Sequence, residues 1–171
     1  CEDRWGRMEM RGKTIASLLM MAKSDNPDMY KQWREANIKT FLYHSLREEK
    51  PNEWDISQVI VKLYKDRFVC ADAKRDMWFE FMNHHWEAMD DSVPLKKLLA
   101  TEVVDLYYNL KADIANQQRN AEESERTRLE KQEKKCKDII TALKTCSFQD
   151  KLLKMCKIVL HDPVFLKKCD E

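Results

Sequence analysis

Glycine is nearly absent from this sequence, and that scarcity most constrains what the chain can fold into. The 171 residues contain two glycines, Gly6 and Gly12, and four prolines. Glycine supplies the positive φ of tight turns and both residue types interrupt helices, so a chain with few of them favours long helices. Apolar residues make up 43% of the chain, which is adequate for a core. The composition therefore predicts a mainly α protein.

Apolar residues recur at helical spacing in several segments. A first helix is expected over about residues 14–23, and a second from Pro27 to about Leu46, with Asp25 or Asn26 as its N-cap. Together these two helices would form an α-hairpin. Further helical patterns cover about residues 55–65, 94–110, 129–143 and 148–160.

Two details of this helical pattern lead to separate expectations. Asp55, with Gln58 three residues later, resembles a capping pair at the start of the third helix. Residues 116–126 are polar on every side, so a helix either crosses this stretch as a solvated rod or frays into a linker.

Between the third and fourth helices the apolar pattern changes to the period of a strand. Strands are expected at residues 68–71, 77–82 and 85–89, with a polar turn from Asp72 to Asp76 and a two-residue turn at Asn83 and His84. These strands would form a small three-stranded antiparallel β-meander. Because so small a sheet needs cover for its apolar face, we expect the flanking helices to pack on it.

These elements divide the chain into three segments. Residues 1–50 form a helical hairpin, residues 51–115 a connector of helix, β-meander and helix, and residues 116–171 a basic helical segment. The charged stretch 47–52 is the best candidate for the first boundary. The predicted fold is therefore a helical connector, mainly α with a small meander.

The cysteines and the apolar runs indicate the cellular compartment that is expected for this chain. Six cysteines occur without a CxxC motif, and those at 136, 146 and 156 lie on a lysine-rich helical background, which favours reduced thiols used as small apolar residues. No apolar run approaches the roughly 18–20 residues that span a bilayer. We expect an intracellular protein without a membrane partner. Because the chain begins at Cys1 rather than methionine, we also expect a piece of a longer protein.

The sequence contains no signature of catalysis. It has no GxxxxGK[ST] loop, no DxD pair and no serine elbow, so neither nucleotide hydrolysis nor nucleotidyl transfer is expected in it. His84 and His85 with Cys70 could be imagined as a zinc site. Adjacent strand residues point to opposite faces, however, so a structural or surface role for these histidines is favoured and no metal or other cofactor is expected.

Basic residues concentrate near the C-terminal end. Residues 126–168 contain 12 basic and 5 acidic residues, whereas the rest of the chain is net acidic. A surface of this kind could follow a phosphate backbone without sequence preference, and a solvated face is an equal alternative. The candidate DNA-binding residues are Lys131, Lys134, Lys135, Lys137, Lys144, Lys151, Lys154 and Lys157, with Lys74 and Arg75 from the meander.

The aromatic residues of the meander allow two interpretations. The rings of Trp78, Phe79, Phe81 and Trp86, next to Lys74, Arg75, Lys96 and Lys97, could stack on nucleic-acid bases beside a basic edge. Six acidic residues share the region and reduce its positive charge, so packing of the rings between sheet and helix is favoured.

Three blocks of sequence, in this order, resemble a known family. Residues 15–30, IASLLMMAKSDNPDMY, resemble the helix that closes a primase C-terminal domain, and residues 63–86, LYKDRFVCADAKRDMWFEFMNHHW, resemble the connector before a superfamily 3 helicase. Residues 143–166, LKTCSFQDKLLKMCKIVLHDPVFL, are similar to the helical run before the ATPase. The family is the poxvirus-type primase-helicase of nucleocytoplasmic large DNA viruses.

The resemblance implies a function that spacing alone does not show. In this family the connector sits at the collar of a hexameric ring, holds subunits together and passes DNA toward the AAA+ motor, while the primase and the ATP- and Mg²⁺-binding residues lie outside it. The family often carries a basic residue where His85 stands here. Trp78 and Trp86 match its motif and would serve as packing anchors of the hairpin. The residues of the structural motif as a whole are Phe68, Cys70, Trp78, Phe79, Phe81 and Trp86.

Two hypotheses of different classes follow. The first is a structural and oligomerisation connector of a viral replicative primase-helicase, not itself an enzyme, with itself, DNA and viral replication proteins as partners in the infected host cell. The second is a freestanding helical adaptor that binds another protein through an exposed apolar stripe. Self-association distinguishes them, because an adaptor should stay monomeric until its partner is added.

Overall fold

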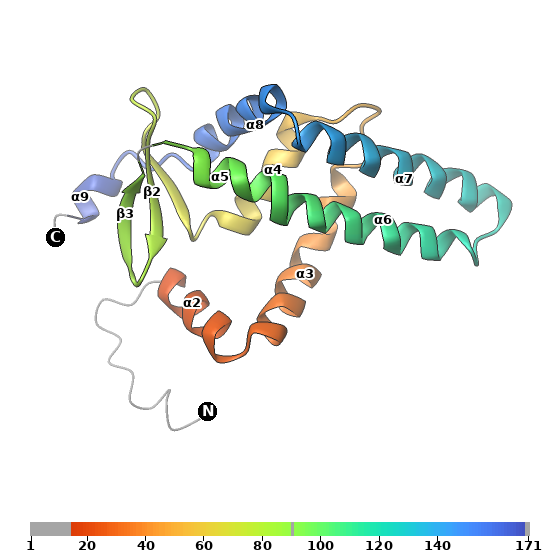
Figure 1. The fold of residues 1–171 in the computed structure, drawn as a ribbon, viewed down its shortest axis with the longest axis horizontal. Coiled ribbons are helices and arrows are strands. Elements are labelled where there is room, and N and C mark those ends of the chain that lie inside the picture. The colour runs from red at the N-terminus through yellow and green to blue at the C-terminus, as the bar shows by residue number, and fades with distance from the viewer. Residues whose placement is uncertain (1–14, 90, 170–171) are drawn as a thin grey trace.

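A computed structural model describes residues 15–89 and 91–169 and shows a mainly helical chain with one small antiparallel sheet toward one end (Figure 1). The predicted fold class is therefore confirmed. Before the sheet lie α2 (Ile15–Asp25), α3 (Pro27–His44) and α4 (Glu53–Tyr64), and the sheet consists of β1 (Phe68–Asp72), β2 (Met77–Met82) and β3 (His85–Met89). After it come α5 (Val93–Leu98), the π-helical segment η1 (Leu99–Val103), α6 (Val104–Gln118), α7 (Glu123–Leu143), α8 (Cys146–Val159) and α9 (Phe165–Cys169).

Asparagine side chains begin two of the helices before the sheet. The Asn26 side chain accepts a hydrogen bond from the backbone N–H of Met29 at 3.0 Å, as one of the two predicted caps requires. The expected pairing of Asp55 with Gln58 at the start of α4 is wrong. Asn52 caps this helix instead, because its side chain accepts from Trp54 N at 2.8 Å and so starts the helix two residues earlier.

The sheet has the strand order β1-β2-β3, and both of its turns follow the predicted pattern. Asn83 and His84 have φ of 49° and 66°, the positive values that a two-residue hairpin turn of type I′ needs. A bulge between Cys70 and Asp72 shifts the register of β1 against β2, whereas β2 and β3 pair without a break. The meander is therefore more regular at its outer strand than at its inner one.

α5, η1 and α6 follow one another without an intervening turn. The helix starts at Val93, whose N–H donates to the Asp91 carboxylate at 2.7 Å. Within η1, Glu102 accepts a hydrogen bond from the Tyr64 hydroxyl at 3.0 Å and forms an ion pair with Arg34 at 3.3 Å. Burial is the main reason that the pKa of Tyr64 is raised, so its hydroxyl stays protonated and continues to donate. The π-helical segment thus ties α3 and α4 to the later helices.

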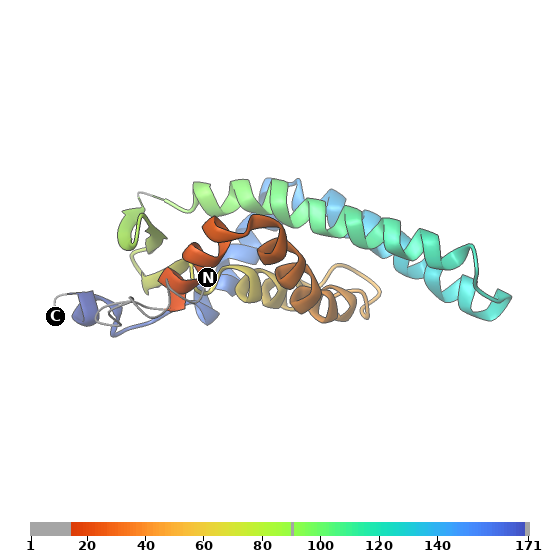
Figure 2. The same cartoon turned by 90° about the horizontal axis from the view of Figure 1, so that it is seen from below.

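The polar stretch around residue 120 is where the chain reverses direction. α6 ends at Gln118, residues 119–122 form the turn, and α7 begins at Glu123 and packs antiparallel on α6. The stretch is therefore neither one continuous rod nor a frayed linker. Both views show the far part of this helical hairpin extending beyond the rest of the described chain (Figures 1 and 2).

One hydrophobic core includes residues from all three of the predicted segments. It joins α3, α4, one face of the sheet, the helices from α5 to α7, and α8. Each large aliphatic side chain buried in it contributes roughly 1.5–3 kcal/mol. The largest fully buried side chains at its centre are Trp78, Tyr64, Tyr107 and Phe68.

The cysteine thiols that the structure describes are unpaired. Cys70, Cys136 and Cys156 are buried as small apolar residues, and burial raises the pKa of both Cys136 and Cys156 to about 12. Cys146 is exposed at the start of α8, so the prediction of a buried thiol is wrong there. Cys1 lies outside the described residues, as does the side chain of Cys169. No described helix combines the length and apolarity needed to cross a membrane.

Candidate nucleic-acid interface

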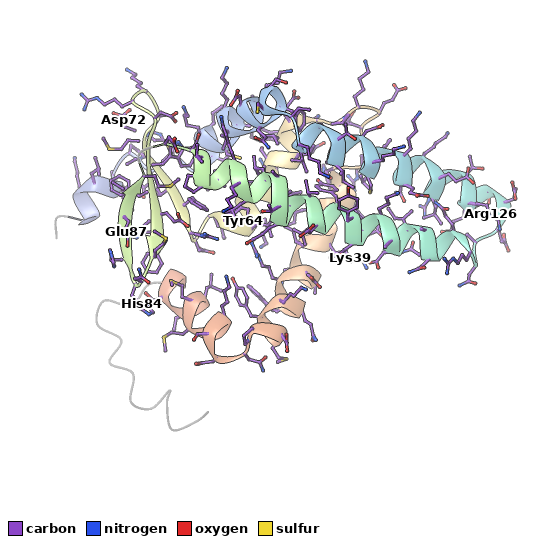
Figure 3. The ribbon with its side chains drawn as sticks, viewed as in Figure 1. Lys39, Tyr64, Asp72, His84, Glu87 and Arg126 are labelled. Carbon is purple, nitrogen blue, oxygen red and sulfur yellow. The ribbon has the colours of Figure 1, made fainter. Side chains whose placement is uncertain are left out.

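The turn between β1 and β2 presents two of the candidate DNA-binding residues. Lys74 and Arg75 are exposed at its tip. The Asp72 carboxylate accepts hydrogen bonds from the backbone N–H groups of both residues, at 2.8 and 3.0 Å. These bonds hold the pKa of Asp72 below its usual range, so the carboxylate stays ionised and the turn stays fixed near neutral pH. Figure 3 shows Asp72 at one end of the sheet and His84 at the other.

Asp76 ends this turn and joins it to α8. Its backbone has a positive φ of 57°, a conformation that aspartate tolerates better than most residues. Its carboxylate lies 2.7 Å from the Lys157 ammonium on α8 and accepts a hydrogen bond from the Trp78 indole at 2.8 Å. The hydrogen bond from Lys157 is the main cause of the lowered pKa of Asp76. The ion pair between Asp76 and Lys157 is therefore present above the pKa of the Asp76 carboxyl. It is lost as the pH falls through that pKa and the carboxyl becomes protonated.

A second ion pair brings α5 to the same face of α8. The Lys96 ammonium lies 2.7 Å from the Asp150 carboxylate, and this hydrogen bond raises the pKa of Lys96. Asp150, Lys154 and Lys157 share one face of α8, because they are spaced four and three residues apart. Lys154 lies between the two ion pairs and is exposed. We call this surface the basic corner; its members are Lys74, Arg75, Lys96, Lys154 and Lys157.

The basic corner carries only a modest positive charge. Its five cations are accompanied by Asp72, Asp76 and Asp150, and by Asp91 close to Lys96, which leaves a net charge of about +1. Lys96 and Lys157 are already used to join elements, whereas Lys74, Arg75 and Lys154 extend into solvent. An exposed cluster of this kind can attract a phosphate backbone at low salt without reading a particular base.

The structure places three other candidate lysines in internal contacts. Lys135 donates from α7 to the backbone carbonyls of Leu46 and Arg47, at 2.9 and 3.1 Å, and so satisfies carbonyls just beyond α3. Lys144 donates to the Tyr108 hydroxyl at 3.2 Å and lies over its ring. Lys151 forms an ion pair with Glu53 on α4 at 3.6 Å. These lysines fasten the C-terminal helices to the earlier part of the chain.

The remaining candidates form a separate group on α7. Lys131, Lys134 and Lys137 are exposed on this helix. Glu130 and Asp138 are interleaved with them, so this side of α7 has mixed charge. The structure thus divides the predicted basic surface into the basic corner and a weaker group on the long hairpin. Arg126, near the tip of that hairpin, lies far from the sheet (Figure 3).

The aromatic side chains of the meander point to its two opposite faces. Phe68, Cys70 and Trp78 are buried on the face that packs on the main core, with Trp78 only 1% exposed. On the other face, the Phe165 ring from α9 lies 5.0 Å from Phe79 and 5.1 Å from Trp86, measured between ring centroids. Phe81, also buried, packs on Trp86. Phe165 therefore occupies the position that a stacked base would take above Phe79 and Trp86.

His84 and His85 do not converge on a common ligand. His84 occupies the turn, whereas the His85 imidazole lies 2.9 Å from the Glu87 carboxylate on the same strand. Cys70 lies on β1, on the other side of β2 from these residues. Among the described residues, no group of three or more His, Cys, Asp or Glu side chains is placed to hold a metal ion.

The acidic partners of the basic corner are the part that sequence reasoning missed. Asp76 and Asp150 bring the turn, α5 and α8 together, yet each lies far along the chain from the lysine it binds. No local pattern predicts such pairs, since they depend on how α8 packs on α4 beside the turn. The aspartate at the end of the predicted turn was the available hint, because this residue type is common in turns.

The described residues form a mainly helical domain with a basic corner, and comparison with known proteins finds a similarity to a viral protein. No family model matches the sequence. Over its whole length the chain is 28% identical, across 179 aligned residues, to a protein of Acanthamoeba polyphaga mimivirus named "Putative helicase L207/L206". The chain spans 18% of the length of that relative. It is thus similar to one region of a viral protein that carries the name of a helicase.

Proposed function

We propose that this chain is a structural and oligomerisation connector within a viral replication protein, a primase-helicase of the poxvirus type. The observation that carries the proposal is its similarity, over its full length, to 18% of a much longer viral protein named as a helicase. In such a protein the chemistry would lie in other regions, where ATP and Mg²⁺ bind. The connector would act inside the infected host cell, at the collar of a ring formed with further copies of itself.

The fold supports a scaffolding role. One core joins elements from near residue 38 to residue 160, so this part of the chain forms one packed unit. The α6–α7 hairpin extends from that body and offers a long surface to neighbouring subunits (Figure 2). Ion pairs between distant segments, such as Lys39 with Asp113 at 3.0 Å, further fix the early helices to the hairpin.

Self-association provides the first test. We expect the chain to form oligomers at micromolar concentrations, up to hexamers, because a collar domain must contact its neighbours in the ring. Sedimentation velocity across a concentration series would measure the mass. A chain that remains monomeric at every concentration would contradict the proposal. It would favour the adaptor instead, which the exposed Trp33 (54%) and Ile158 (67%) support as an alternative.

DNA binding through the basic corner provides the second test. We expect weak binding without sequence preference to both single- and double-stranded DNA, measured by fluorescence anisotropy. If about three phosphates are contacted, raising the salt from roughly 50 to 200 mM should weaken binding about 40-fold. The double variant Lys74→Glu/Lys154→Glu should weaken binding. The slope of log affinity against log salt should fall by the equivalent of about two phosphate contacts.

The matched control for this test is Lys131→Glu/Lys134→Glu, which makes the same change of charge on α7. None of these four lysines forms an ion pair with another described residue, so both variants should fold normally. Equal loss of binding in the two variants would mean that net charge matters and the basic corner does not. Absence of binding at low salt would remove DNA from the proposal.

A further inference from the structure

One edge of the sheet is closed by the chain itself, and the other is open. At the β1 edge, Cys70 donates its backbone N–H to the carbonyl of Leu160 at 2.9 Å and accepts from the N–H of Asp162 at 3.0 Å. At the other edge, β3 pairs with β2 alone, and within the described residues no further strand lies beside it (Figure 1). The open edge therefore belongs to His85–Met89.

The hairpin geometry decides which backbone groups this edge offers. In a two-residue turn of type I′, the flanking residues Met82 and His85 form a hydrogen-bonded pair, and bonded and non-bonded pairs then alternate along the strands. Trp86 and Ala88 consequently fall in non-bonded positions. Their N–H and C=O groups point away from β2, where an added strand would pair with them.

Three of the features that protect an exposed edge are missing from β3, although this strand is short and carries the charge of Glu87. Natural edge strands carry proline, lysine or a bulge that prevents another strand from pairing. β3 contains neither proline nor lysine, and its register against β2 is unbroken. The one bulge of the sheet lies on β1, at the edge that is already closed. β3 can therefore accept another strand, provided that the charges of that strand suit Glu87.

The charges along β3 determine what kind of strand fits. Glu87 lies opposite Glu80 on β2, but Arg67 neutralises Glu80 through a hydrogen bond of 2.8 Å from its Nε. Glu87 keeps a half-exposed carboxylate, which lies 2.9 Å from the His85 imidazole. A second copy that paired antiparallel through Trp86 and Ala88 would place Glu87 opposite Glu87, and directly opposed like charges destabilise a sheet.

We propose that the outer edge of β3 binds an extended segment of a partner protein by strand addition, with a lysine or arginine of that segment opposite Glu87. Backbone hydrogen bonds to Trp86 and Ala88 supply the pairing, and apolar side chains of the segment lie beside the Trp86 ring. This inference is independent of the proposed collar role, because it uses the edge of the sheet rather than the hairpin or the basic corner.

Amide hydrogen exchange of the full chain, followed by NMR, tests the open edge directly. In the free protein at low concentration, the amides of Trp86 and Ala88 should exchange rapidly, while that of Glu87, which is bonded to β2, should be protected. The probe is a seven-residue peptide with blocked ends that alternates valine and lysine. Its addition should slow exchange at Trp86 and Ala88 by about tenfold or more.

Two comparisons make the test specific. A peptide that alternates valine and glutamate should give no protection, because it places a carboxylate opposite Glu87. Ala88→Pro removes an outward-pointing N–H without removing a bond to β2, so it should abolish the effect of the valine–lysine peptide, whereas Ala88→Thr should keep it.

Three results would overturn the proposal. Protection of Trp86 and Ala88 at high dilution without peptide would show that the chain covers this edge itself. Protection that grows with protein concentration alone would identify a second copy as the occupant. Equal protection by the valine–glutamate peptide would refute the role of Glu87.

Discussion

Trp78→Ala is expected to destabilise the protein by about 3–5 kcal/mol, the cost of emptying a large buried site. Trp78 is 1% exposed on the core face of the sheet, and its indole N–H donates to Asp76 in the turn beside α8. The substitution removes both the largest core side chain and a bond that helps order the turn. Urea denaturation followed by circular dichroism would measure the change in the free energy of unfolding.

Trp33→Ala is the matched control for this prediction. Trp33 is 54% exposed on α3, so the same substitution there should change the free energy of unfolding by less than about 0.5 kcal/mol. A loss of less than about 1 kcal/mol in the free energy of unfolding for Trp78→Ala would contradict the placement of the meander against the main core, because removing a ring that packs there costs more than this.

Arg67→Met is expected to cost about 3 kcal/mol, since it leaves a buried carboxylate without its cation. Glu80 is 5% exposed in the middle of β2, and Arg67 binds the same carboxylate oxygen through two nitrogens, at 2.6 and 2.8 Å. Methionine keeps most of the apolar stem and removes the charge. Chemical denaturation near neutral pH would measure the effect.

A double variant separates the charge from the packing. Arg67→Met/Glu80→Met should recover much of the lost stability, because the unpaired charge is then gone. Arg75→Met is the control: Arg75 is 79% exposed and lies 3.8 Å from Asp72, so its loss should change stability by less than about 0.5 kcal/mol. If the double variant is as unstable as Arg67→Met, the unpaired charge of Glu80 is not the cause of the lost stability.

Local sequence signals predicted most of the elements. The two-residue turn at Asn83 and His84 and the asparagine cap at Asn26 were predictable because each depends on residues a few positions apart. The capping of α4 was mispredicted for the same kind of reason: Asn52 and Asp55 both satisfy the local preference, and the structure selects the earlier one.

Features that depend on distant residues were not predictable. The π-helical segment brings Glu102 to Tyr64 and Arg34, which lie on two other helices. Phe165 covers the aromatic face of the meander from a segment that follows it by about eighty residues. The candidate interface was also only partly predictable. The residue types indicated a basic surface, but in the fold Lys135, Lys144 and Lys151 bind other residues of the same chain.

The β1 edge is closed by residues that are synthesised long after the sheet. Cys70 meets His161 across a separation of about ninety residues, so the meander leaves the ribosome long before the segment that seals it. Until residues 160–162 have been synthesised, both edge strands of the sheet have unpaired backbone groups that can bind other chains. The β1 edge therefore stays available for pairing until the segment after α8 has been made.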